Sequence, residues 1–172
     1  LHIQATTDQL TGIYNRRVIF EALDEAMENS KQSKDRQFAT IMFDIDFFKQ
    51  VNDNYGHAGG DAVLISFAQL LQTEISSPNI VGRIGGEEFL AILYLDPDQA
   101  KEFCTKLIKK INSNVVNFEG TDIKVSSSGG VAFSTETETS ADLTNKADER
   151  LYEAKKDGRN RFKLIDTELV GD

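Results

Sequence analysis

The chain has 172 residues, enough for one domain with a sizeable core, because a domain of this size buries roughly 70% of its unfolded surface. Its 19 Lys and Arg against 28 Asp and Glu give a net charge of −9, which argues against a nucleic acid as partner. A small anionic ligand is still permitted at a place where several Lys and Arg side chains cluster. The single cysteine, Cys104, excludes an internal disulfide, and the longest apolar run, residues 89–95, is too short to span a bilayer.

The N-terminal segment is expected to be a connection to an upstream region. The chain begins at Leu1 rather than at methionine, so we expect residues 1–7 to be the end of a linker or helix and residues 8–172 to form a single domain. No basic segment followed by an apolar stretch resembles a secretory signal. We therefore expect a cytoplasmic domain without membrane contact of its own, although a full-length protein can carry a membrane anchor elsewhere.

A helix and a buried strand are predicted in the first third of the chain. The apolar residues at helical spacing are Ile19, Leu23, Ala26 and Met27. Residues 38–43 (FATIMF) then form an apolar run of strand length that stops at Asp44. This pattern indicates a buried strand that carries a carboxylate at its end.

Two helices and a hairpin are predicted next. We expect a short helix at 47–53, a loop at 54–60 and a longer helix. The apolar residues of the longer helix are Val63, Leu64, Phe67, Leu71 and Ile75. Two apolar runs, 80–84 and 89–93, are separated by Gly85, Gly86, Glu87 and Glu88. This arrangement is typical of a β-hairpin with both glutamates in its turn.

The C-terminal half continues as a mixture of helices and strands. An amphipathic helix opens near Asp96 and Pro97, and Cys104 lies in its apolar stripe as a core residue. Residues 115–118 and 123–133 are predicted strands joined as a second hairpin through 119–122. A last helix has Ser140 as its candidate N-cap and Gly158 as its candidate C′ residue, and residues 161–165 are expected to form a final edge strand. The elements predict an α+β domain, with a mostly antiparallel central sheet flanked by helices.

The turn of the first hairpin crowds negative charge. Glu87 and Glu88 are adjacent in a tight bend, and a bound cation would relieve their repulsion. The alternative is a solvated turn with Arg83 as the counter-charge. The segment by itself leaves both interpretations open.

Asp44 and Asp46 extend the acidic character of this region. Carboxylates at a strand end are suited to Mg²⁺ and to phosphoryl transfer. Asp46 precedes the expected helix, and we favour a role as its N-cap over a role in metal binding.

Five blocks of the sequence resemble one family in the same order. GGEEF at 85–89 is similar to the signature of the GGDEF-domain diguanylate cyclases, in its Glu variant. The other blocks are DQLTGIYNRR at 8–17, DIDFFKQVND at 44–53, GHAGGD at 56–61 and ADERLYEAKKDGRN at 147–160. The resemblance implies a palm-like fold similar to that of nucleotide cyclases and polymerases, and we expect the block at 8–17 to close the domain structurally.

The resemblance also implies a metal site. Asp44 and Glu87 would bind Mg²⁺, or Mn²⁺ in its place, through their carboxylates, and Ile45 through its backbone carbonyl. Glu88 would assist with metal binding or with deprotonation.

GTP is the substrate that the resemblance implies. Asn52 and Asp61 match positions that bind the guanine edge, although Asp61 can instead be a carboxylate at a helix N-terminus. The phosphates would be bound by Lys49, Lys155, Arg159 and the backbone amides around Phe47 and Phe48. Lys155 is also typical of a last helical turn. His57 falls in the same region, where a turn-shaping role is preferred over metal ligation.

The implied reaction joins two GTP molecules into cyclic di-GMP in a homodimer, controlled by an upstream sensor. Many relatives carry an Arg-x-x-Asp inhibitory site for the product, and the corresponding residues here are Ser76 and Asn79. We therefore expect no product inhibition through this surface. The alternatives to an enzyme are an inactive nucleotide-binding module and a dimerisation domain.

Overall fold

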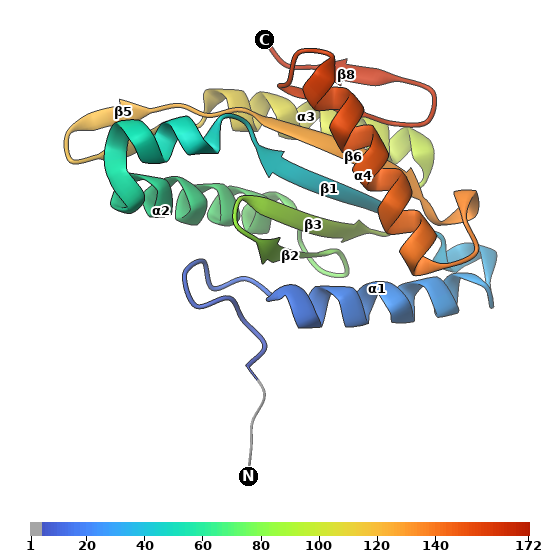
Figure 1. Ribbon diagram of the computed structural model, residues 1–172. Coiled ribbons are helices and arrows are strands. Elements are labelled where there is room, and N and C mark those ends of the chain that lie inside the picture. Colours follow the sequence, from blue (N-terminus) through green and yellow to red (C-terminus); the bar gives the residue numbers. More distant parts are fainter. Residues whose placement is uncertain (1–4) are drawn as a thin grey trace.

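A six-stranded sheet forms the centre of the molecule (Figure 1). The computed structural model describes residues 5–172. The strands are Ala39–Ile45 (β1), Ile80–Gly85 (β2), Glu88–Leu93 (β3), Ser127–Phe133 (β6), Arg161–Lys163 (β7) and Glu168–Val170 (β8), in the order β2-β3-β1-β6-β7-β8. Neighbouring strands are antiparallel except for the parallel pair β6 and β7. The predicted mostly antiparallel sheet is confirmed.

Four helices cover the two faces of this sheet (Figure 1). Arg16–Ser30 (α1) and Ser140–Lys156 (α4) pack on one face, and Phe48–Glu74 (α2) and Pro97–Ser113 (α3) on the other. Short 3₁₀ helices occur at Lys34–Arg36 and Ser134–Glu136. The α+β class is therefore confirmed.

Strand β1 is buried on both faces because helices cover it from both sides. Ile41 and Phe43 pack in the cluster with α2 and α3, whereas Met42 packs in the cluster with α1 and α4. This alternation follows from the two-residue period of a strand. It turns Asp44, which has the same parity as Met42, toward the layer of α1 and α4.

Cys104 is fully buried in α3, as predicted. Burial raises the pKa of its thiol to about 12. The residue is therefore a core filler, because a thiol that stays protonated is a poor nucleophile.

The loop predicted at residues 54–60 is wrong, because helix α2 continues through it. The helix is broken only at Gly56, whose φ of 72° and ψ of 175° are not helical. Residues 54–60 are polar and rich in glycine, which is a composition typical of a loop. Two of them, Gly59 and Gly60, are nevertheless buried, so the segment packs without an apolar stripe.

The strand predicted at 123–133 is divided in the structure. Val116–Phe118 (β4) and Thr121–Ile123 (β5) form the predicted hairpin, but as a separate two-stranded sheet, and β6 begins only at Ser127. The physical reason is that β6 has to pair with β1, whereas β5 pairs only with β4.

Two predictions at the C-terminal end also need correction. The N-cap of α4 is Thr139 rather than Ser140, because the Thr139 hydroxyl accepts a hydrogen bond from Asp142 N at 3.1 Å. Gly158 directly follows the C-cap Asp157, as predicted. Strand β7 is not an edge strand, since β8 folds back and pairs with its free side.

The boundary predicted at residue 7 stays a prediction. Residues 1–4 of the expected linker lie outside the described residues, and Thr7 already forms a β-bridge with Tyr14. No helix within residues 5–172 has the length and apolar character required to cross a membrane.

Candidate active site

A cavity of about 400 Å³ lies where β1 ends, α2 begins, the β2–β3 hairpin turns and α4 ends. Eight of the twelve residues predicted from the sequence line it, and these are Asp44, Ile45, Phe47, Phe48, Lys49, Glu87, Lys155 and Arg159. Gln50 and Asp53 line it as well and were not predicted. They follow Lys49 on the first turns of α2, so a search along that helix could have found them.

The end of β1 lies directly against the hairpin turn. Asp44 pairs in register with Glu88 of β3 on one side and with Ser128 of β6 on the other. The backbone N–H of Ile45 donates a hydrogen bond to the carbonyl of Glu87 at 3.2 Å. The sheet register therefore brings two acidic segments, 43 residues apart in sequence (87 − 44 = 43), to one place.

Lys155 is the cation that pairs with Asp44. Its ammonium donates to Asp44 Oδ2 at 2.5 Å, and Asp44 is only 6% exposed. Burial raises the pKa of the Asp44 carboxyl; the Lys155 hydrogen bond and charge oppose this effect, and the negative charges of Glu87 and Asp46 add to it. The fold thus holds a carboxylate in a place that disfavours its charge.

Glu88 does not line the cavity, but it is the register partner of Asp44 and is in a similar electrostatic position. Partial burial raises its pKa, and the negative charges of Asp44 and Asp148 raise it further. Burial also raises the pKa of Asp148 on α4, and Lys155 opposes that shift. Asp148 was not predicted, but it lies seven residues before Lys155 and so on the same face of the helix.

The turn of the hairpin is held from outside the sheet. Arg83 donates from Nε to the carbonyl of Gly86 at 2.9 Å and forms an ion pair with Asp8 at 3.1 Å. Arg16 of α1 donates to the carbonyl of Ile84 at 2.9 Å. The residues of the block at 8–17 therefore fasten the hairpin, in agreement with the structural role expected for that block.

The interpretation of Arg83 as counter-charge for the two glutamates is wrong, because its partner is Asp8. Burial alone would raise the pKa of Asp8. Hydrogen bonds from the Thr11 side chain and backbone and from Arg83, together with the Arg83 charge, outweigh it and leave this pKa below its ordinary value.

The prediction that Asp46 caps the helix is also wrong. The N-cap of α2 is Phe47, which has a left-handed φ of 55° and offers no side-chain cap. The buried Asp46 carboxylate instead accepts hydrogen bonds from Ser126, Ser128 and Asn160. Asp46 directly follows β1, and its side chain reaches Ser128 of β6 rather than the start of the helix.

Phe47 and Arg159 form one wall of the cavity. The Arg159 guanidinium carbon lies 4.8 Å from the centre of the Phe47 ring, and the ring is 55% exposed. This cation–π contact holds the positive charge beside the cavity that Lys49 and Lys155 also line.

Asn52 and Asp61 do not line the cavity, and both lie on α2. A Cβ at Gly60 would overlap the Asn52 side chain and touch the Phe48 ring, so only glycine allows Asn52 to pack there. Asn52 therefore lies beside the residue that precedes Asp61, which is exposed. His57 is exposed directly after the break at Gly56.

The donor set suits a hard divalent cation. Within residues 5–172, no group of three or more His, Cys, Asp or Glu side chains is arranged to hold an ion without other ligands. Mg²⁺ is commonly bound by one or two carboxylates together with substrate phosphates. Asp44, Glu87 and the Ile45 carbonyl fit that kind of site.

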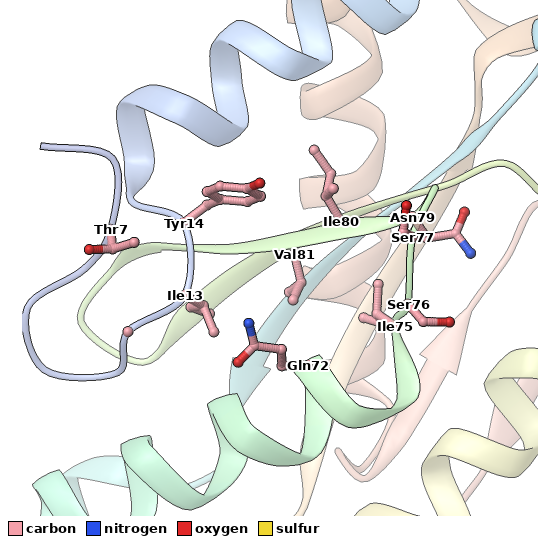
Figure 2. Close-up of a pocket in the computed structure, with 11 residues that line it drawn as sticks. Thr7, Ile13, Tyr14, Gln72, Ile75, Ser76, Ser77, Asn79, Ile80 and Val81 are labelled. Carbon is pink, nitrogen blue, oxygen red and sulfur yellow. The ribbon is translucent and has the colours of Figure 1, made fainter. Parts of the chain in front are cut away.

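A second cavity, of about 490 Å³, lies between the N-terminal turn, the end of α2 and the start of β2 (Figure 2). Ser76 and Asn79 line it together with Tyr14 and Ile80. Its lining contains no charged side chain. An anionic ligand would find no cationic partner in this lining.

Comparison with known proteins identifies the relationship. Residues 5–161 match the family described as "Diguanylate cyclase, GGDEF domain". The chain is 35% identical over 169 residues to diguanylate cyclase DgcS of Shewanella oneidensis, covering 98% of this chain and 56% of that protein. It is 33% identical over 168 residues to diguanylate cyclase A of Treponema denticola, covering 95% and 45%. The chain thus spans about half the length of these relatives.

Solved structures show the same fold. Diguanylate cyclase SiaD of Pseudomonas aeruginosa, solved with its activator SiaC, has a TM-score of 0.89 at 34% identity over 94% of this chain and 62% of that one. The GGDEF domain of DgcB from Caulobacter crescentus, solved with c-di-GMP, has a TM-score of 0.90 at 27% identity over 97% and 99%. These neighbours confirm the palm-like α+β fold. This chain belongs to the GGDEF-domain family of diguanylate cyclases.

Proposed function

We propose that this chain condenses two molecules of GTP into cyclic di-GMP and two pyrophosphates. The observation that carries the proposal is that one cavity has both kinds of charged group in its lining. Its carboxylates come from β1 and the hairpin, and its cations come from α2, α4 and the turn after α4. A volume of about 400 Å³ is within the usual range of small-molecule sites. Both the acidic and the basic groups required for a nucleoside triphosphate with its metal line this space.

Asp44, Glu87 and the Ile45 carbonyl are the proposed ligands of Mg²⁺, with Mn²⁺ as the alternative. The ion, when bound, neutralises charge that develops on the phosphate oxygens and on departing pyrophosphate. Its binding is supported by the environment of the carboxylates. Burial, and then the repulsion between like charges, raises the pKa values of Asp44 and Glu88, and a bound cation would offset both effects.

The phosphates are proposed to lie against Lys49, Lys155, Arg159 and the backbone around Phe47 and Phe48. Lys155 is bound to Asp44 in the structure and is close enough to exchange that carboxylate for a phosphate oxygen once a cation binds Asp44. Glu88, with its raised pKa, is proposed to accept the proton of the attacking 3′-hydroxyl or to support the metal.

Guanine is proposed to lie at Asn52 and Asp61. A carboxylate and an amide accept and donate in the pattern of the guanine edge, which adenine does not present. The packing of Asn52 against Gly60 supports this placement, because it keeps the amide next to Asp61. His57 is proposed to shape this part of α2.

Two domains are proposed to face each other in a homodimer. Each 3′-hydroxyl oxygen attacks the α-phosphorus of the opposing GTP, the bond to pyrophosphate breaks, and two such steps close the ring. A two-fold arrangement supplies both steps with equivalent geometry. We also propose that a region upstream of this chain controls this association.

The test is an assay with GTP and Mg²⁺ that measures cyclic di-GMP across a range of protein concentrations. We expect product from the unsubstituted chain, at a rate that rises with the square of protein concentration while dimers are sparse. Asp44→Ala and Glu88→Gln are each expected to lower the rate by at least about a hundredfold. Glu138→Gln, an exposed carboxylate outside the cavity, is the matched control. Product formation that neither active-site substitution changes contradicts the mechanism, and binding of GTP without product indicates a nucleotide-binding module.

A further inference from the structure

Asp46 is a buried carboxylate that the proposed reaction leaves without a role. It is 3% exposed, and its oxygens accept hydrogen bonds from Ser126 Oγ at 2.6 Å, Ser128 Oγ at 2.6 Å and the backbone N–H of Asn160 at 2.9 Å. The donors come from the segment before β6, from β6 itself and from the turn after α4. One side chain therefore ties the end of β1 both to the start of β6 and to the turn after α4.

The turn after α4 needs such a tie. Arg159 and Asn160 have φ values of 63° and 49°, which are left-handed and unfavourable for residues with a Cβ. Consecutive residues persist in this conformation only when the surrounding structure holds them. The hydrogen bond from Asn160 N to Asp46 Oδ2 acts directly on the peptide that joins these two residues.

Asp46 is also linked to the Arg159 side chain through its neighbour in sequence. Phe47 directly follows Asp46 and is left-handed with a φ of 55°, and its ring centre lies 4.8 Å from the Arg159 guanidinium carbon. Asp46 thus determines both where the Arg159 backbone lies, through Asn160, and where its aromatic support lies, through the chain.

We infer that Asp46 is a positioning residue that places the Arg159 guanidinium at the phosphate side of the cavity. This inference rests on the proposed function, in which Arg159 binds the triphosphate of GTP. Asp46 touches neither substrate nor metal in this role. It works by fixing the hydrogen-bonded turn that carries the arginine and the ring that its guanidinium contacts.

A purely structural role makes a different prediction. A buried, hydrogen-bonded carboxylate that only stabilises the fold would, when replaced, weaken every ligand alike or none. A positioning role through Arg159 weakens ligands that carry phosphates and spares guanosine, which has none.

The experiment measures binding by calorimetry in a Glu88→Gln background, in which consumption of GTP is expected to be at least about a hundredfold slower. Asp46→Asn keeps the size of the side chain but removes its charge and one acceptor. We expect about a tenfold loss of affinity for GTP and less than a twofold change for guanosine. The control is Thr40→Val in β1, which removes another buried side-chain hydrogen bond, to Ala91 O at 2.8 Å. It is expected to lower stability and to leave GTP affinity unchanged.

A double-mutant cycle with Arg159→Ala completes the test. If Asp46 acts through Arg159, then Asp46→Asn has no further effect on GTP affinity once Arg159 is replaced. Additive effects, or equal losses for GTP and guanosine, contradict the role of Asp46. Failure of the unsubstituted chain to bind GTP instead contradicts the proposed function.

Ser128→Ala provides a milder variant in case Asp46→Asn does not fold. It removes one of the three donors and leaves the carboxylate in place. We expect a two- to threefold loss of GTP affinity that likewise disappears in the Arg159→Ala background. An unchanged affinity for GTP in a folded Ser128→Ala chain counts against the inference.

Discussion

At the scale of single residues, the candidate site contains two carboxylates, Asp44 and Glu88, whose charged forms are disfavoured by their surroundings in the fold. Burial raises the pKa of both Asp44 and Glu88. The charges of Glu87 and Asp46 raise the pKa of Asp44 further, and the charge of Asp44 does the same to Glu88. A raised folded-state pKa means that protonation stabilises the native state. That stabilisation is complete below the unfolded-state pKa and is lost as pH rises through the folded-state pKa. These residues are therefore expected to lower stability at neutral pH in exchange for a cation site.

Replacing one of these carboxylates is expected to make the protein more stable. Glu88→Gln removes a charge that partial burial disfavours and that Asp44 and Asp148 repel, so we expect the melting temperature at pH 7 to rise by about 1–3 °C. The gain should disappear as pH falls below the ordinary glutamate value of 4.5, where Glu88 is protonated in both states. It should also shrink in 1 M salt, which screens such charges.

Thermal unfolding followed by circular dichroism across pH checks this expectation. The exposed Glu138→Gln is the control and should show no comparable gain. A Glu88→Gln chain that is less stable than the unsubstituted chain at pH 7 shows that the repulsion has been misjudged.

At the scale of elements, the hairpin that carries Glu87 is fastened to the N-terminal turn and to α1. Asp8 and Arg83, both mostly covered, form the link, and Arg83 also binds the carbonyl of Gly86 inside the turn. Because Gly86 directly precedes Glu87, these contacts connect the N-terminal turn to the segment that carries this carboxylate.

Breaking the link is expected to affect stability and turnover together. Asp8→Ala leaves Arg83 without its partner and removes the acceptor of two hydrogen bonds from Thr11, so we expect a loss of about 1–2 kcal/mol in the free energy of unfolding at pH 7. The pKa of Asp8 is lowered in the fold. The stability that the charged Asp8 carboxylate contributes is therefore fully present above the unfolded-state pKa of 3.8. It declines as the pH falls below that value.

Urea unfolding at several pH values, with the GTP assay in parallel, measures both effects. Asp35→Ala, an exposed carboxylate in the 3₁₀ helix after α1, serves as the control. Equal stability of the Asp8→Ala and Asp35→Ala chains at pH 7 speaks against the link.

At the scale of the whole molecule, the second cavity lies between the N-terminal turn, the end of α2 and the start of β2 (Figure 2). It contains hydroxyl, amide and apolar groups but no charged side chain in its lining. A cyclic dinucleotide has two phosphates, and their recognition ordinarily uses arginine or lysine. The surface is therefore poorly suited to feedback by the proposed product.

We expect cyclic di-GMP not to bind at this surface. Titration of the product into the Glu88→Gln chain with saturating GTP, which occupies the active site, is expected to show no tight binding. Ser76→Ala and Asn79→Ala should each change any residual affinity by less than about twofold, because neither position supplies a cation. Tight binding that depends on Ser76 contradicts this expectation.

Much of the fold could be predicted from the sequence because burial leaves local patterns. The apolar spacing of α1 and α3 and the unbroken run of β1 reflect the faces on which they pack. The hairpin was visible because two apolar runs flank the turn that contains Glu87. Most of the candidate site followed from motifs, since its residues cluster in short blocks, and the cavity contains eight of them.

The tertiary structure decided what depends on partners distant in sequence. Asp46 resembled a helix cap until its partner Asn160, 114 residues away, was placed beside it. Arg83 resembled a counter-charge for the glutamates but pairs with Asp8, 75 residues away. Hydrogen bonds and ion pairs satisfy a polar group from whatever the fold brings near. Local sequence therefore shows that a carboxylate needs a donor, and only the packed chain determines which donor it finds.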